Sequence, residues 1–104
     1  MRTVAGRCRI PDVCVVLIDP GTDILESPPF IAVEILSQSD EMTNVVEKLE
    51  EYWAIGVPYI WLLDPRRSKA YTFQADGLGE VRGQELVATE PEIRLSLADV
   101  FHGL

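Results

Sequence analysis

The chain has 104 residues, of which 47% are hydrophobic and 25% are charged, and its formal net charge is −8. This length suits one domain and excludes two, and the composition excludes a largely disordered chain. The acidic balance disfavours proteins that coat DNA through a general basic face, because phosphate neutralisation supplies much of their affinity. A local site that holds a metal cation remains compatible with the acidic background.

Two classes of protein are excluded by short-range patterns. No apolar run reaches the roughly 18 residues that cross a bilayer, and no apolar stretch of signal-peptide length follows the first basic residues. We therefore expect a cytoplasmic protein without a membrane segment.

The two cysteines, Cys8 and Cys14, lack partners at zinc-site spacing. Cys14 lies among valines, which predicts a small buried side chain rather than half of a disulfide.

The first half of the chain predicts two strands and a helix. The apolar residues 13–18 and 30–36 each indicate a buried strand. Residues 37–40, Ser-Gln-Ser-Asp, offer helix N-cap candidates. Gly56 suits the position just past a helix end, and Pro58 prevents continuation. Between them, apolar residues recur at helical spacing: Met42, Val45, Val46, Leu49, Tyr52 and Trp53.

The second half is rich in strand signals. Residues 59–63 form a third apolar run, residues 70–74 alternate as a half-exposed strand does, and residues 85–88 indicate another strand. The tail at 93–97 also alternates and leads into a short turn at 98–101. The fold class is therefore α/β in the α+β sense: a mixed β-sheet with one packed helix, in a single domain over residues 1–104.

Two acids adjoin the predicted strands. Glu34 lies between Val33 and Ile35 inside an apolar strand, where a carboxylate is costly to desolvate unless it is paired or bound to a metal. A salt bridge to a structural arginine, or a strand end that is exposed, is an equally good explanation of Glu34 taken alone. Asp12 follows Pro11 at the start of the first strand, which also suits an ordinary turn residue.

Lys48 lies on the flank of the predicted helix stripe, where it can lean over a sheet edge. Taken alone it is best explained as a surface lysine with a partly buried stem. The three residues together make chemical sense. Two carboxylates from adjacent strands can hold Mg²⁺, and a nearby ammonium can offset the charge that develops on a phosphate. Phosphodiester hydrolysis fits this set.

The spacing of these residues is similar to that of a known family. The segments that carry the resemblance are Arg9-x-Pro11-Asp12-Val13, Val33-Glu34-Ile35-Leu36-Ser37-x-Ser39, Lys48-x-x-x-Tyr52 and Gly56-Val57-Pro58-x-x-Trp61-Leu62-x-Asp64-Pro65. They resemble the Uma-two-type restriction endonucleases, within the PD-(D/E)XK nuclease superfamily. The resemblance is tight over residues 9–65 and loose to about residue 101. It implies a restriction-endonuclease-like fold.

The resemblance also implies roles for individual residues. Asp12 would be the acid of the Pro-Asp motif, Glu34 the second metal ligand, and the Ile35 carbonyl a further ligand. Leu36 occupies the place where the wider superfamily has its lysine, and Lys48 matches the lysine that this branch carries on the following helix. The chain departs from the family pattern at Asn44 and Gln38. Only eleven residues precede Asp12, so by the resemblance we expect the helix and strands that normally precede the Pro-Asp motif to be missing, as in a truncated relative, a fragment, or a protomer that a partner completes.

Two hypotheses of function follow. The first is an endonuclease that uses Mg²⁺ or Mn²⁺ to hydrolyse DNA, with Asp12, Glu34 and Lys48 as its catalytic residues. The alternative is a catalytically inactive nuclease-fold relative that serves in binding or assembly. Absent N-terminal elements would leave an open sheet edge, so a homodimer is compatible with both. We expect other notable side chains to be structural: Tyr52, Trp53, Tyr59 and Trp61 in packing, and His102 at the surface.

Overall fold

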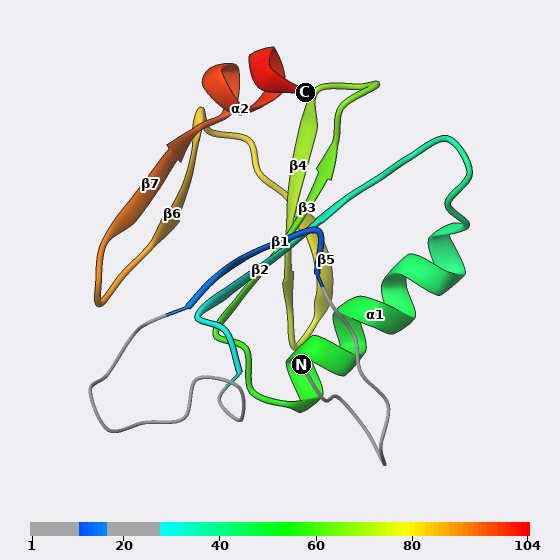
Figure 1. The fold of residues 1–104 in the computed structure, drawn as a ribbon, viewed down its shortest axis with the longest axis vertical. Helices are drawn as coiled ribbons and strands as arrows, with labels where there is room; N and C mark the ends of the chain where they lie inside the picture. Colours follow the sequence, from blue (N-terminus) through cyan, green and yellow to red (C-terminus); the bar gives the residue numbers. More distant parts are fainter. Residues whose placement is uncertain (1–10, 17–27) are drawn as a thin grey trace.

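A five-stranded mixed sheet forms the centre of the fold (Figure 1). The computed structural model describes residues 11–16 and 28–104. The strands run in spatial order along the chain: β1 (Val13–Val15), β2 (Ile31–Ile35), β3 (Tyr59–Asp64), β4 (Lys69–Gln74) and β5 (Gly77–Glu80). Only β2 and β3 of these neighbours are parallel. The parallel pair places helix α1 between two strands, as such a connection requires.

Helix α1 (Met42–Ala54) covers one face of this sheet. Val45, Leu49 and Tyr52 of its predicted stripe are buried there, whereas Met42 and Trp53 are exposed. Gly56 just beyond its end has φ +88°, a conformation that glycine adopts without strain. The predicted N-cap within residues 37–40 is wrong: the cap is Glu41, whose side chain makes no capping bond. Asp40 instead accepts a 2.9 Å hydrogen bond from the Ser37 N–H and closes the preceding loop. The core on this face contains Ala32, Val45, Leu49, Tyr52, Val57, Ile60 and Leu62.

The opposite face is covered by the C-terminal part of the chain. Strands β6 (Glu85–Ala88) and β7 (Ile93–Ser96) pair into a small second sheet, and helix α2 (Leu97–Gly103) follows directly. The segment predicted as a short turn is thus helical. Alternate residues of β2 and β3 point to this side, as the strand period of two requires. The buried core here contains Phe30, Ile31, Val33, Trp61, Leu63, Ala70, Leu86 and Ala88.

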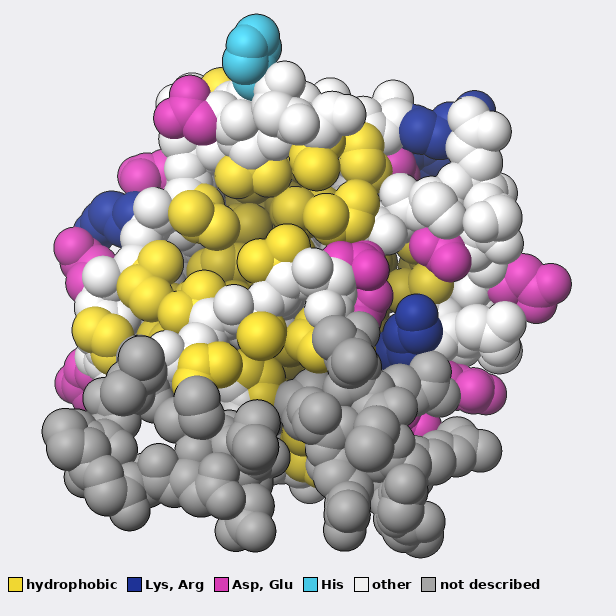
Figure 2. Space-filling model, viewed as in Figure 1, with side chains coloured by type: hydrophobic (Ala, Val, Ile, Leu, Met, Phe, Trp, Pro, Cys, Tyr) yellow, Lys and Arg dark blue, Asp and Glu magenta, His cyan; other side chains and the backbone are white. Residues whose placement is uncertain are grey.

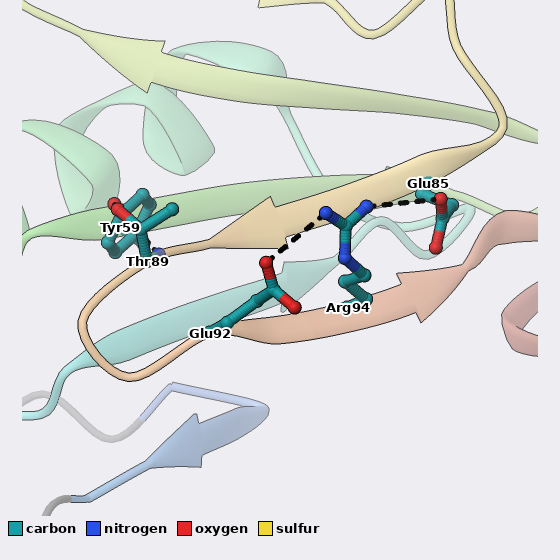
Figure 3. A network of polar contacts seen from close by, with 5 residues as sticks. All are labelled: Tyr59, Glu85, Thr89, Glu92 and Arg94. Atoms are coloured by element: carbon teal, nitrogen blue, oxygen red, sulfur yellow. Dashed lines mark hydrogen bonds and ion pairs between the residues drawn. The ribbon is translucent and has the colours of Figure 1, made fainter.

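Polar contacts occur both within the β6–β7 hairpin and between it and the central sheet (Figure 3). The Tyr59 hydroxyl accepts a 3.1 Å hydrogen bond from the Thr89 N–H and lies 2.9 Å from the Thr89 hydroxyl. Within the hairpin, Arg94 pairs with Glu85 at 3.5 Å and with Glu92 at 3.2 Å. These ion pairs are exposed and contribute little stability, so the apolar core holds the hairpin in place. Figure 2 shows apolar side chains gathered in the hollow between this hairpin and the sheet.

The remaining expectations meet mixed outcomes. The first strand is shorter than predicted, since β1 ends at Val15 and residues 17–27 lie outside the described residues, as does Cys8. Cys14 is exposed rather than buried, because β1 is an edge strand that α1 does not cover. Trp53 is 45% exposed, whereas Trp61 is buried as expected and His102 is at the surface. None of the described helices is long and apolar enough to cross a membrane.

Candidate active site

Two carboxylates meet where β1 begins and β2 ends. The antiparallel register pairs Val13 with Val33, so the residues one step outward, Asp12 and Glu34, face each other across the two strands. Both side chains project to the face that α1 covers, by strand parity with Cys14 and its partner Ala32. The structure thus brings together two acids that are 22 positions apart in the sequence.

Asp12 is held in place by the backbone of β2. Its Oδ2 accepts a 2.7 Å hydrogen bond from the Ile35 N–H, although the Asp12 side chain itself is exposed. In a strand, the N–H and C=O of one residue point to the same neighbouring strand. The Ile35 carbonyl is therefore directed to the side on which Asp12 lies. The next amide agrees with this alternation, because the Leu36 N–H points the other way and donates to the Leu63 carbonyl at 2.8 Å.

Glu34 is the one buried charged residue among those described, with 5% of its surface exposed. The Tyr52 hydroxyl, itself fully buried on α1, donates a 2.5 Å hydrogen bond to Glu34 Oε1. A hydrogen bond from a hydroxyl to an ionised carboxylate is of the charge-assisted kind. Glu34 makes no ion pair with another described residue, which argues against the structural salt bridge that the sequence left open.

Lys48 and Tyr52 reach this site from the same side of α1. They are four residues apart, which places their side chains one above the other on the helix surface. Burial raises the pKa of the Glu34 carboxyl above its ordinary value, and the negative charge of Asp12 raises it further. The Tyr52 hydrogen bond and the positive charge of half-buried Lys48 oppose that rise. The charges of Asp12 and Lys48 therefore both influence the pKa of Glu34.

The donor set is suited to a hard divalent cation. Carboxylate and carbonyl oxygens are the ligands that Mg²⁺ and Mn²⁺ prefer. No group of three or more His, Cys, Asp and Glu side chains that could hold a metal occurs in residues 11–16 and 28–104. An ion at this site would therefore rely on the two carboxylates, one backbone carbonyl and water, which is the usual arrangement for Mg²⁺.

The three residues singled out from the sequence lie together, and their chemical roles stay predictions. Tyr52 packs against the sheet as expected. The sequence did not predict its second role, which is to donate a hydrogen bond to the carboxylate of Glu34. A signal for it was present, because Tyr52 follows Lys48 by one helical turn on the stripe that faces β2. The hydrogen bond from the Ile35 N–H to Asp12 could not be predicted from the sequence, because it depends on the register between β1 and β2.

Comparisons with known proteins agree with this geometry. The Uma2 family model, described as "Putative restriction endonuclease", matches residues 1–104. Among solved structures, the chain is similar to one titled as a "putative nuclease belonging to DUF820" from Anabaena variabilis, with a TM-score of 0.59 and 20% sequence identity. The match covers 73% of this chain and 45% of that chain, so this chain spans less than half of its neighbour's length. No curated protein matches.

Proposed function

Because this chain belongs to the Uma2 family of restriction-endonuclease-like proteins, we propose that it is a metal-dependent endonuclease that hydrolyses DNA phosphodiester bonds. The observation that carries the proposal is the pairing of Asp12 with buried Glu34 at adjoining strand ends, beside a lysine. The similarity to the solved structure from Anabaena variabilis supports the fold alone. The proposed chemistry rests on the residues of the site, because proteins that share a fold can differ in function.

In this proposal, Asp12 and Glu34 hold Mg²⁺ or Mn²⁺ through their carboxylates, and the Ile35 carbonyl contributes a third oxygen. When bound, such an ion lowers the pKa of a water molecule and polarises the phosphate. Lys48 places its ammonium where charge builds up on the phosphate oxygens. Tyr52 fixes the orientation of Glu34 through its hydrogen bond, so that the carboxylate is set before substrate arrives.

Metal titration of the full chain tests this proposal. We would titrate Mg²⁺ and Mn²⁺ into the wild type and into Glu34→Gln by calorimetry, and follow plasmid cleavage by both. Glu50→Gln is the matched control, because it removes the same charge from the exposed side of α1. We expect Glu34→Gln to lose metal binding and cleavage, and the control to keep both.

The same experiment separates the alternative function. A folded wild type that binds neither ion would refute the metal site. The inactive relative would then be favoured, acting in assembly through β1, the edge strand of the sheet within the described residues, and through the apolar hollow. Its oligomeric state, measured by sedimentation, would show whether a homodimer forms. Metal binding without cleavage would indicate a site that needs further protein to act.

A further inference from the structure

A pocket of about 540 Å³ opens on the α1 face of the sheet, directly beyond the acid pair. Two of its lining residues tie it to the site: Leu36 follows Glu34 by one step on the same strand face, and Leu62 is the register partner of Glu34 on β3. The start of α1 at Met42 forms another wall. The pocket thus shares its wall with two residues that neighbour Glu34 in the sheet, although Glu34 itself does not line it.

The outer wall of this pocket is the β3–β4 turn, which carries two arginines. Arg66 and Arg67 are both exposed, and neither forms an ion pair with another described residue. With Lys69 they make up the one cluster among the nine basic residues of the chain. Lys69 differs from the arginines because it pairs with Glu80 at 3.6 Å. Within the part of the chain that the structure describes, the turn thus presents two guanidinium groups that form no ion pair, in a chain of net charge −8.

Two acids also line the pocket, and both are engaged by nearby backbone. Asp40 accepts its hydrogen bond from the Ser37 N–H, and Asp64 Oδ1 accepts a 3.4 Å bond from the Arg67 N–H. Asp64 therefore shapes the turn that displays the arginines. A strongly anionic ligand with its own oxygens would find its donors on Arg66 and Arg67, since guanidinium groups bind phosphate oxygens in bidentate fashion.

We propose that Arg66 and Arg67 bind the phosphate backbone of the DNA strand next to the phosphate that is cut. This inference rests on the proposed nuclease function, because it names how the substrate of that site is held. The spacing is suitable. Leu62 lies two residues before the end of β3 at Asp64, which is about 7 Å at the rise of a strand, and the turn that carries Arg66 and Arg67 follows directly. A span of about 7 Å corresponds to roughly two base-pair steps of rise along a duplex.

Such contacts hold the substrate in register without reading its sequence. Phosphate contacts fix the orientation of a nucleic acid, and each one contributes a salt-dependent share of the affinity. On an acidic protein, a local pair of arginines would set where the strand enters, because the surrounding surface repels it. Leu36, Leu62 and Leu78 give the pocket an apolar part, and Asp40 and Asp64 in its lining each accept a backbone hydrogen bond.

Fluorescence anisotropy of a labelled duplex DNA, without divalent metal and over a range of salt concentrations, tests the proposal. The test variant is Arg66→Ala/Arg67→Ala. The control, Arg82→Ala/Arg94→Ala, removes the same charge from exposed positions outside the pocket. We expect the test variant to bind on the order of tenfold more weakly, with a salt slope lower by about two, at every duplex sequence. The control should stay close to the wild type.

Several outcomes would overturn the inference. Equal weakening by both double variants would mean that bulk charge alone is responsible, and no weakening by the test variant would remove the pocket from substrate binding. A wild type that binds RNA but not DNA would also refute it. The proposed function fails separately: if Glu34→Gln cleaves normally while the arginine variant loses affinity, the pocket stands and the catalytic assignment falls.

Discussion

The hydrogen bond between Tyr52 and Glu34 gives the sharpest stability test of the site. Tyr52→Phe removes one hydroxyl and leaves a buried carboxylate without its donor. Hydrogen bonds to charged groups contribute about 1.5–3 kcal/mol, and Tyr52 and Glu34 are both too buried for water to replace the lost partner freely. With a denaturant slope in the usual range, this loss should lower the midpoint of urea unfolding by about 1 M.

A double-mutant cycle shows whether the negative charge of Glu34 accounts for the stability lost in Tyr52→Phe. In a Glu34→Gln background the same bond is neutral, so Tyr52→Phe should cost only about 0.5–1.5 kcal/mol. Tyr71→Phe is the matched control, because Tyr71 is half-buried on β4 and its side-chain hydroxyl makes no hydrogen bond with another described residue. Equal unfolding midpoints for wild type and Tyr52→Phe would refute the reasoning, as would an equal cost in both backgrounds.

Three further predictions concern the same site. Since burial raises the pKa of Glu34 above 4.5, the native state binds this proton more tightly than the unfolded state, and wild type loses stability as pH rises above that value. Glu34→Gln should therefore be more stable than wild type at neutral pH, with the gain vanishing below pH 4.5 in pH-dependent urea unfolding. Asp12→Asn should keep the stability of the strand end, because its amide oxygen can still accept from Ile35, whereas Asp12→Ala should lose it; both should lose metal binding by calorimetry. Lys48→Met should raise the pKa of Glu34 in a carboxyl NMR titration and lower cleavage by about 10²–10³-fold with metal affinity retained; an unchanged pKa would place Lys48 away from Glu34.

Much of the architecture could be predicted because local patterns and packing agree. The apolar runs at β2 and β3 and the helical spacing of α1 each specify one element, and the structure bears them out. Strand β5 was missed because Gly77 and Gly79 are poor strand formers, and its pairing with β4 supplies what the sequence lacks. Helix α2 was underestimated because a seven-residue segment carries too few turns for a clear period.

The burial errors have one common cause. Cys14 and Trp53 are apolar residues in apolar patterns, and local pattern predicts burial for both. Whether they are buried depends on what covers them. Cys14 lies on β1, at the edge of the described sheet, and is exposed there. Trp53 lies on α1 with 45% of its surface exposed, although its ring meets that of Phe73 edge-on. The spacing of apolar residues in the sequence predicts which side chains share one face of a strand or helix. Whether another element covers that face depends on the three-dimensional fold.

Glu34 contradicts its local environment more than any other described residue. Every neighbour in β2 favours an apolar side chain, and replacing a buried charge by an apolar residue is often neutral or stabilising. The fold instead adds a second acid across the strand pair, which makes the charge harder to keep, and a tyrosine and a lysine that partly compensate. Stability alone would not assemble this set, because burial and the neighbouring acid both disfavour the ionised form of Glu34. The cation of the proposed function would resolve the conflict, since it would favour the ionised state of both acids at once.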